Sequence, residues 1–118
     1  MKICIPSSGT NLDSQIEPHF GRCAYFIFVE PESMEFEAVP NPNVSARGGA
    51  GVRSSEIMAQ HGVHTVVSVQ VGPKAAQVLH AAGIKIITVE GGTVREALEA
   101  FKNRLSSGGD SSSLSLEK

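Results

Sequence analysis

Short apolar segments alternate with polar, glycine-containing segments along most of the chain. Residues 2–6 predict a short buried strand, which the turn-forming residues 7–9 end. Residues 24–30 are rich in aromatic and β-branched side chains and predict a second strand. Residues 35–40 alternate charged and apolar side chains. They therefore predict a third strand with one solvated face, which forms a hairpin with the second.

The second half of the chain alternates helical and strand patterns. Apolar residues at helical spacing cover about residues 52–61, 73–82 and 94–105, and the last segment begins with a capping box. The β-branched segments 63–69 and 84–89 predict two further strands between these helices.

This order of elements predicts one α/β domain. Strands joined through a helix run parallel with right-handed crossovers, whereas the early hairpin makes the second strand antiparallel to its neighbours. We therefore expect a five-stranded mixed sheet in the order 3-2-1-4-5, flanked by three helices. The domain is predicted to cover residues 1–105. Residues 106–118 are rich in serine and glycine without periodicity, and we expect a disordered tail there.

Five loops are predicted to meet where the parallel strands end, which we call the carboxyl edge. Ligands of open parallel sheets bind at this edge. Strands one, three, four and five end in residues 7–9, 41–51, 70–72 and 90–92. The second strand runs the other way, so the residues before it, 19–23, lie at the same edge.

The carboxyl edge has the features of an anion site. Glycines allow backbone to approach a ligand, and helices beginning near residues 52, 73 and 94 direct free N–H groups there. Arg22, Arg47, Arg53 and Lys74 lie in or beside these loops. Such glycines also serve tight turns in any fold of this kind. No loop matches a P-loop or a dinucleotide fingerprint, so a nucleotide ligand has no motif support.

Composition narrows the classes of partner. The formal net charge is −2, without the basic excess typical of nucleic-acid binding. No apolar run approaches the roughly 20 residues that span a bilayer, and the N-terminus lacks a secretory pattern. We therefore expect a cytoplasmic protein with no nucleic-acid or membrane partner, whose Cys4 and Cys23 are thiols.

His19 is the best single candidate for a metal ligand, because a neutral imidazole in a loop at this edge suits iron or another transition metal. Cys23 follows four residues later and is soft enough to join it. A loop histidine is more often a plain surface residue, and a free cysteine is commonly buried in the core.

An enzymatic function has few candidate residues. The only aspartates are Asp13 and Asp110, too few carboxylates for a two-metal nuclease. Ser7 or Ser8 could pair with His19, but no nucleophile elbow is present. Binding without catalysis explains the residues better.

Several short motifs occur in an order that resembles the dinitrogenase iron–molybdenum cofactor biosynthesis family, over about residues 1–105. They are Met-Lys-Ile-Cys-Ile-Pro-Ser-Ser-Gly at the N-terminus, His19-Phe20-Gly21-Arg22, Asn41-Pro42, and the segments 48–51, 72–75 and 82–86 before the final Gly-Thr-Val-x-Glu-Ala helix. The resemblance implies a ribonuclease H-like fold. It also implies that an iron–molybdenum cofactor or iron–sulfur precursor is carried between assembly proteins, with a histidine or cysteine near the edge holding the cluster.

The first hypothesis is thus a non-enzymatic carrier of an iron–sulfur or iron–molybdenum cluster, with cofactor-assembly proteins as partners. The resemblance places the metal ligand at His19, with Cys23 as a weaker addition. The alternative is a small interaction or regulatory module that binds a partner protein or another anionic small molecule. A nuclease is a distant third. The predicted cofactor-binding residues are Ser7, Ser8, Gly9, His19, Arg22, Arg47, Gly48, Gly49, Gly51, Arg53 and Gly72.

Overall fold

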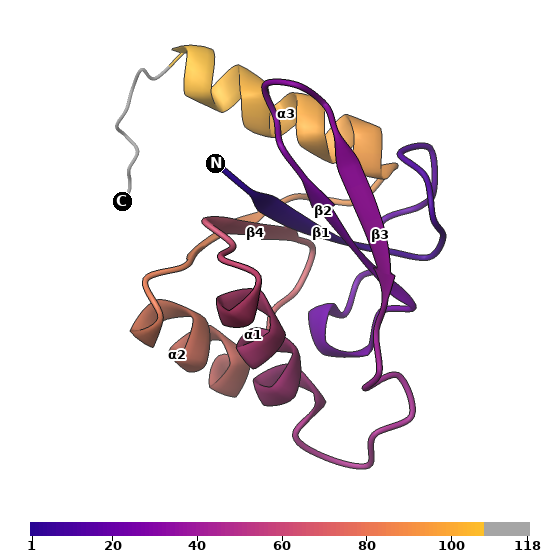
Figure 1. The fold of residues 1–118 in the computed structure, drawn as a ribbon, viewed down its shortest axis with the longest axis vertical. Helices are drawn as coiled ribbons and strands as arrows, with labels where there is room; N and C mark the ends of the chain where they lie inside the picture. Colours follow the sequence, from indigo (N-terminus) through magenta and orange to yellow (C-terminus); the bar gives the residue numbers. More distant parts are fainter. Residues whose placement is uncertain (108–118) are drawn as a thin grey trace.

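The domain is built on one mixed sheet (Figure 1). The computed structural model describes residues 1–107, so most of the predicted tail lies outside the described residues. The strand order is β3-β2-β1-β4-β5, which confirms the predicted order. β2 is antiparallel to β1 and β3, whereas β1, β4 and β5 run parallel. The strands are β1 (Ile3–Ser7), β2 (Tyr25–Val29), β3 (Phe36–Pro40), β4 (Thr65–Ser68) and β5 (Lys85–Thr88).

Helices cover both faces of this sheet. α1 (Ala50–Gln60) and α2 (Pro73–Ala81) pack together on one face, and α3 (Val94–Ser107) covers the other (Figure 1). A short 3-10 helix, η1 (Phe20–Arg22), lies against α1. The result is a three-layer α/β domain.

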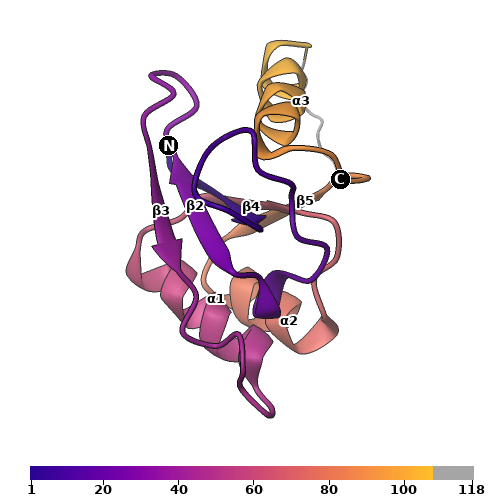
Figure 2. The same ribbon diagram turned by 90° about the vertical axis from the view of Figure 1, so that its right-hand side faces the viewer.

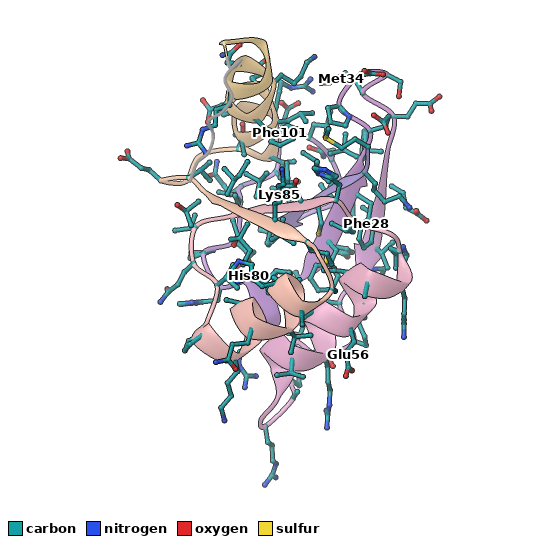
Figure 3. The ribbon with its side chains drawn as sticks, turned by 90° about the vertical axis from the view of Figure 1, so that its left-hand side faces the viewer. Phe28, Met34, Glu56, His80, Lys85 and Phe101 are labelled. Carbon is teal, nitrogen blue, oxygen red and sulfur yellow. The ribbon has the colours of Figure 1, made fainter. Side chains whose placement is uncertain are left out.

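The alternation of side chains along the strands produces two separate cores. On β1, Ile3 and Ile5 face α3, whereas Cys4 faces α1 and α2. Phe28 of β2 and Phe101 of α3 consequently belong to different cores, on opposite faces of the sheet (Figure 3). Because every residue of β1 is buried, apolar burial on both faces stabilises the central strand.

Some element boundaries differ from the prediction. α1 begins at Ala50, two residues earlier than expected, because Gly49 adopts a left-handed φ of 71° and forms the N-cap. α3 continues to Ser107, beyond the expected domain boundary, because no glycine or proline interrupts residues 94–107. η1 forms in a segment for which neither a helix nor a strand was predicted.

Candidate functional site

A pocket of about 620 Å³ opens on the α1–α2 side of the carboxyl edge. It lies between η1, the first turns of α1 and α2, and the residues that follow β4; η1 is seen beside these helices in Figure 2. Its lining consists of His19, Phe20, Gly21, Arg22, Gly49, Ala50, Gly51, Val52, Gln70, Gly72, Pro73, Lys74 and Ala75. Five of the eleven predicted cofactor-binding residues therefore meet here: His19, Arg22, Gly49, Gly51 and Gly72.

Glycine contacts bring the three walls of the pocket together. A Cβ on Gly21 would lie 2.8 Å from both the N and the Cα atom of Gly51, so backbone meets backbone at this point. A Cβ on Gly51 would lie 3.1 Å from the Cβ atom of Ala75, in the first turn of α2. No larger side chain fits at Gly21 without moving η1 away from α1.

Buried polar side chains hold η1 against α1. The Gly21 carbonyl accepts hydrogen bonds from Ser54 Oγ at 3.2 Å and from Asn41 Nδ2 at 3.1 Å. Asn41 Nδ2 also donates to the Cys23 carbonyl at 2.9 Å, and its Oδ1 accepts the Asn43 N–H. These residues lie behind the pocket and determine where its η1 wall stands.

Backbone hydrogen bonds place His19 at the mouth of the pocket. The Phe20 N–H donates to the Gln70 carbonyl at 3.3 Å, and the Gln70 N–H donates to the Pro18 carbonyl at 3.0 Å. Phe20 is buried and packs against Phe26, with ring centroids 5.9 Å apart. This anchored backbone leaves His19 exposed at the pocket.

The first turns of α1 and α2 expose free N–H groups to the pocket. Neither helix has a side-chain cap: the N-cap residues are Gly49 and Gly72. Helical hydrogen bonding begins with the N–H groups of Arg53 and Ala76, so those of residues 50–52 and 74–75 have no helical partner. Two helix ends thus meet at one pocket, with the charge preference of an anion site.

The start of α3 does not contribute to this site, contrary to expectation. Its capping box forms as predicted: the Glu96 N–H donates to Thr93 Oγ1, and the Thr93 N–H donates to Glu96 Oε1. The N–H groups of Val94 and Arg95 donate to backbone carbonyls of Ser14 and Leu12. With its donors occupied, this helix end has none left for a ligand.

The loop after β1 packs on the α3 side of the sheet and therefore does not line the pocket. Leu12 and Ile16 are buried in the core beneath α3, and the Ile16 N–H donates to the Gly92 carbonyl. Ser7 is buried with its Oγ 2.8 Å from the Gly9 carbonyl oxygen. The predicted ligand residues of this loop, Ser7, Ser8 and Gly9, do not line the pocket.

The charged side chains at the pocket are basic. Arg22 and Lys74 line it, together with His19, and no aspartate or glutamate is among its lining residues. The Arg22 guanidinium donates through Nη1 to the Ala46 carbonyl. In the described part of the chain the ion pairs are Met1–Glu30 and Arg95–Asp13, so no carboxylate neutralises Arg22.

Three further predicted residues lie outside the pocket. Arg47 and Gly48 are exposed in the connection between β3 and α1, and Arg53 is exposed on α1. They stand near the site in the chain without lining it.

Cys23 is fully buried and does not line the pocket. Burial raises the pKa of its thiol to about 12, against the opposing effect of Asn41 Nδ2, which lies 3.8 Å from Sγ. A thiol of this kind stays protonated near neutral pH, so a metal would have to displace its proton in order to bind it. Within residues 1–107 no group of three or more His, Cys, Asp and Glu side chains could hold a metal ion.

Sequence reasoning did not select several residues of the site. Gln70 is the second residue after β4, and its place in a loop at the carboxyl edge could have identified it. The scaffold residues Asn41 and Asn43 occur in an Asn-Pro-Asn segment, a composition typical of side-chain-stabilised turns. Ser54 carries no such signal, because a helical serine gives no hint that it bonds to another loop.

No helix among the described residues is long and apolar enough to cross a membrane.

Fold and pocket together define a small α/β domain with a basic, amide-lined site at its carboxyl edge. The chain belongs to the dinitrogenase iron-molybdenum cofactor family, whose model matches residues 1–104. This membership associates it with a cofactor-binding or carrier role.

The chain is also similar to individual proteins over most of its length. An uncharacterized protein of Methanocaldococcus jannaschii is 31% identical over 104 residues, which are 86% of this chain and 85% of that protein. The apo form of the orange protein from Desulfovibrio gigas is 38% identical with a TM-score of 0.82, covering 86% of this chain and 87% of its own. A NifB-like protein from Thermotoga is 37% identical with a TM-score of 0.76 and the same coverage.

Proposed function

We propose that this protein binds and carries, without catalysis, an anionic metal cluster of the iron–sulfur or iron–molybdenum type. The pocket between η1, α1 and α2 is the proposed site. The observation that carries the proposal is the meeting of two uncapped helix ends with Arg22 and Lys74 in one pocket without carboxylates. Amide N–H groups and cations both favour an anionic ligand there.

The donor set suits a cluster that arrives already assembled. His19 is the one side chain of the lining with the properties of a strong transition-metal ligand, and both cysteines are buried elsewhere. A cluster that brings its own sulfide needs few protein ligands. In this proposal the imidazole ligates one metal, while backbone amides donate to the sulfides and outer oxygens.

Glycines at the helix starts allow the cluster to approach the backbone. A Cβ on Gly49 or Gly72 would meet no atom within 4 Å, so the space in front of them is open. Side chains there would stand between the ligand and the N–H groups of the first turns. Gly51 belongs to the same lining, whereas Gly48 lies outside it.

The residues that line the pocket suit the binding and release of a cluster better than they suit catalysis. The lining holds one titratable imidazole, and no carboxylate, serine or thiol stands beside it to act as nucleophile or general base. Release of an intact cluster to an assembly protein requires an open site, and this pocket opens to solvent.

Anaerobic reconstitution tests the proposal. The protein is incubated with ferrous iron, sulfide and molybdate, desalted, and analysed for visible absorption and metal content. We expect stable colour and bound metal in the wild type, and loss of both in His19→Ala. His80→Ala is the matched control, because His80 is an exposed histidine on α2 away from the lining (Figure 3).

The outcomes separate the hypotheses. Unchanged uptake in His19→Ala would remove His19 from the site. A wild-type protein that takes up neither metal nor colour would contradict carriage and favour the alternative, a module that binds a partner protein or another small anion.

A further inference from the structure

Arg22 belongs to the pocket and to the connection between β3 and α1 at the same time. Its side chain lines the pocket, while its guanidinium donates through Nη1 to the Ala46 carbonyl. This connection projects from the body of the domain beside α1 (Figure 1). One cationic side chain therefore links the proposed cluster site to an external segment.

Residues 44–48 are otherwise weakly held. Their hydrogen bonds in the structure are the one from Arg22 and one from the Ala46 N–H to the Asn43 carbonyl. A Cβ on Gly48 would meet no atom within 4 Å, and Val44 is 44% exposed. Both ends of the segment are firm, because Asn43 is buried and bonded to Asn41, and Gly49 is the N-cap of α1. The hydrogen bond from Arg22 is thus a main constraint on the conformation of residues 44–48, whose two ends are fixed.

The positively charged guanidinium of Arg22 is bonded only to a neutral acceptor within residues 1–107. The carbonyl of Ala46 is neutral, and no carboxylate in the described residues pairs with this guanidinium. A hydrogen bond between guanidinium and an anion is stronger than one to a neutral carbonyl. An anion in the pocket would therefore compete with Ala46 for Arg22.

We propose that Arg22 is a switch that reports whether the pocket is loaded. Without ligand it holds residues 44–48 through the Ala46 carbonyl; with a multiply charged anion in the pocket it turns to the anion and releases them. Val44 and Arg47 then become mobile on the outer surface, where a partner protein can distinguish the loaded form from the empty one. This inference rests on the proposed function, since it assumes that an anion occupies the pocket.

Hydrogen exchange measured by mass spectrometry tests the switch. The ligand used is tetrathiomolybdate, a dianion in which sulfide coordinates the metal. Its binding is followed by its own visible absorption. In the wild type, saturation should protect the amides of residues 19–22 and 50–52. It should accelerate exchange of the Ala46 amide, the one amide of residues 44–48 that donates a hydrogen bond in the structure, by about tenfold, the change expected when the constraint of one ordinary hydrogen bond is lost. Ordinary ligand binding would give protection or no change in that segment.

Two variants distinguish the hydrogen bond that Arg22 makes to the segment from the positive charge that it brings to the pocket. Arg22→Gln should show the accelerated exchange of the Ala46 amide already without ligand, and no further change with it. Lys74→Gln removes the same charge from the same pocket, but Lys74 makes no hydrogen bond to the segment. Its segment should remain protected when empty and be released at saturation.

Each result bears on the switch or on both proposals. Binding of the dianion with unchanged or slower exchange in residues 44–48 overturns the switch and leaves the binding function intact. Unaltered exchange in ligand-free Arg22→Gln overturns it as well. Failure of the wild type to bind either the dianion or the reconstituted cluster overturns both.

Discussion

Gly21 and Gly51 touch backbone to backbone, with a Cβ on Gly21 only 2.8 Å from the Cα atom of Gly51. This contact joins η1 to the first turn of α1 and so sets the width of the pocket. The pocket is therefore formed by a steric condition that only glycine meets at position 21.

Gly21→Ala should lower the free energy of unfolding by about 1–3 kcal/mol, because the added methyl group pushes η1 away from α1. The same displacement moves His19 and Arg22, so cluster uptake should fall as well. Urea unfolding and reconstitution measure the two effects. Gly48→Ala is the control for stability, since its Cβ enters open space and Gly48 is not itself a helix cap, so the change in stability should be less than about 0.5 kcal/mol. Equal stability of the two variants would contradict the steric account.

Asn41→Asp should destabilise the domain by about 3 kcal/mol at neutral pH, because a buried carboxylate would face two carbonyl oxygens that the amide now bonds. Only the protonated acid can donate to a carbonyl. The pKa of the new carboxyl should thus be raised by folding, and the lost stability should return as the pH falls. Urea unfolding of wild type and variant at two pH values measures this. A defect of equal size at both would show that the carbonyl contacts are not its cause.

The Cys23 thiol should resist alkylation in the folded protein. Burial raises its pKa to about 12, so iodoacetamide at pH 9 should label it far more slowly than an unfolded control, in which the thiol has its ordinary pKa. Cys23→Ala should retain cluster uptake, since the side chain does not reach the pocket. Mass spectrometry of the labelled peptides measures the rate. Rapid native labelling, or loss of uptake in the variant, would return Cys23 to the site.

Asp13 should titrate below an ordinary aspartate. Its hydrogen bond from Arg95 Nε, at 2.9 Å, and the charge of Arg95 hold the pKa of this exposed carboxyl down. A pKa lowered by folding stabilises the native state above the unfolded pKa, and this contribution disappears as the pH falls through the folded value. NMR titration should show the Asp13 midpoint rising in Arg95→Gln. An unmoved midpoint would mean that the pair does not persist in solution.

The sheet could be predicted from the sequence because its signals are local. Alternating charged and apolar residues at positions 35–38 mark the start of β3, and the capping box at Thr93 and Glu96 marks the start of α3. The hairpin, together with right-handed crossovers, then leaves few arrangements for five strands.

The sequence could not predict in the same way which loops of the carboxyl edge lie on the α1–α2 face and which lie on the α3 face. It depends on Leu12 and Ile16, which pack beneath α3 and draw the loop after β1 away from the pocket. Their spacing of four within a polar segment was a weak sign of burial. The bond from Ser54 to the Gly21 carbonyl joins residues 33 positions apart and leaves no local trace.

The placement of α3 on the face opposite α1 and α2 has a practical consequence for fusing or immobilising the domain. The last helical residue, Ser107, belongs to the layer that does not form the pocket. A protein fused to that end, or a support coupled to it, would therefore leave the mouth of the pocket pointing outward. The domain can therefore be attached through α3 while its pocket stays accessible to a ligand.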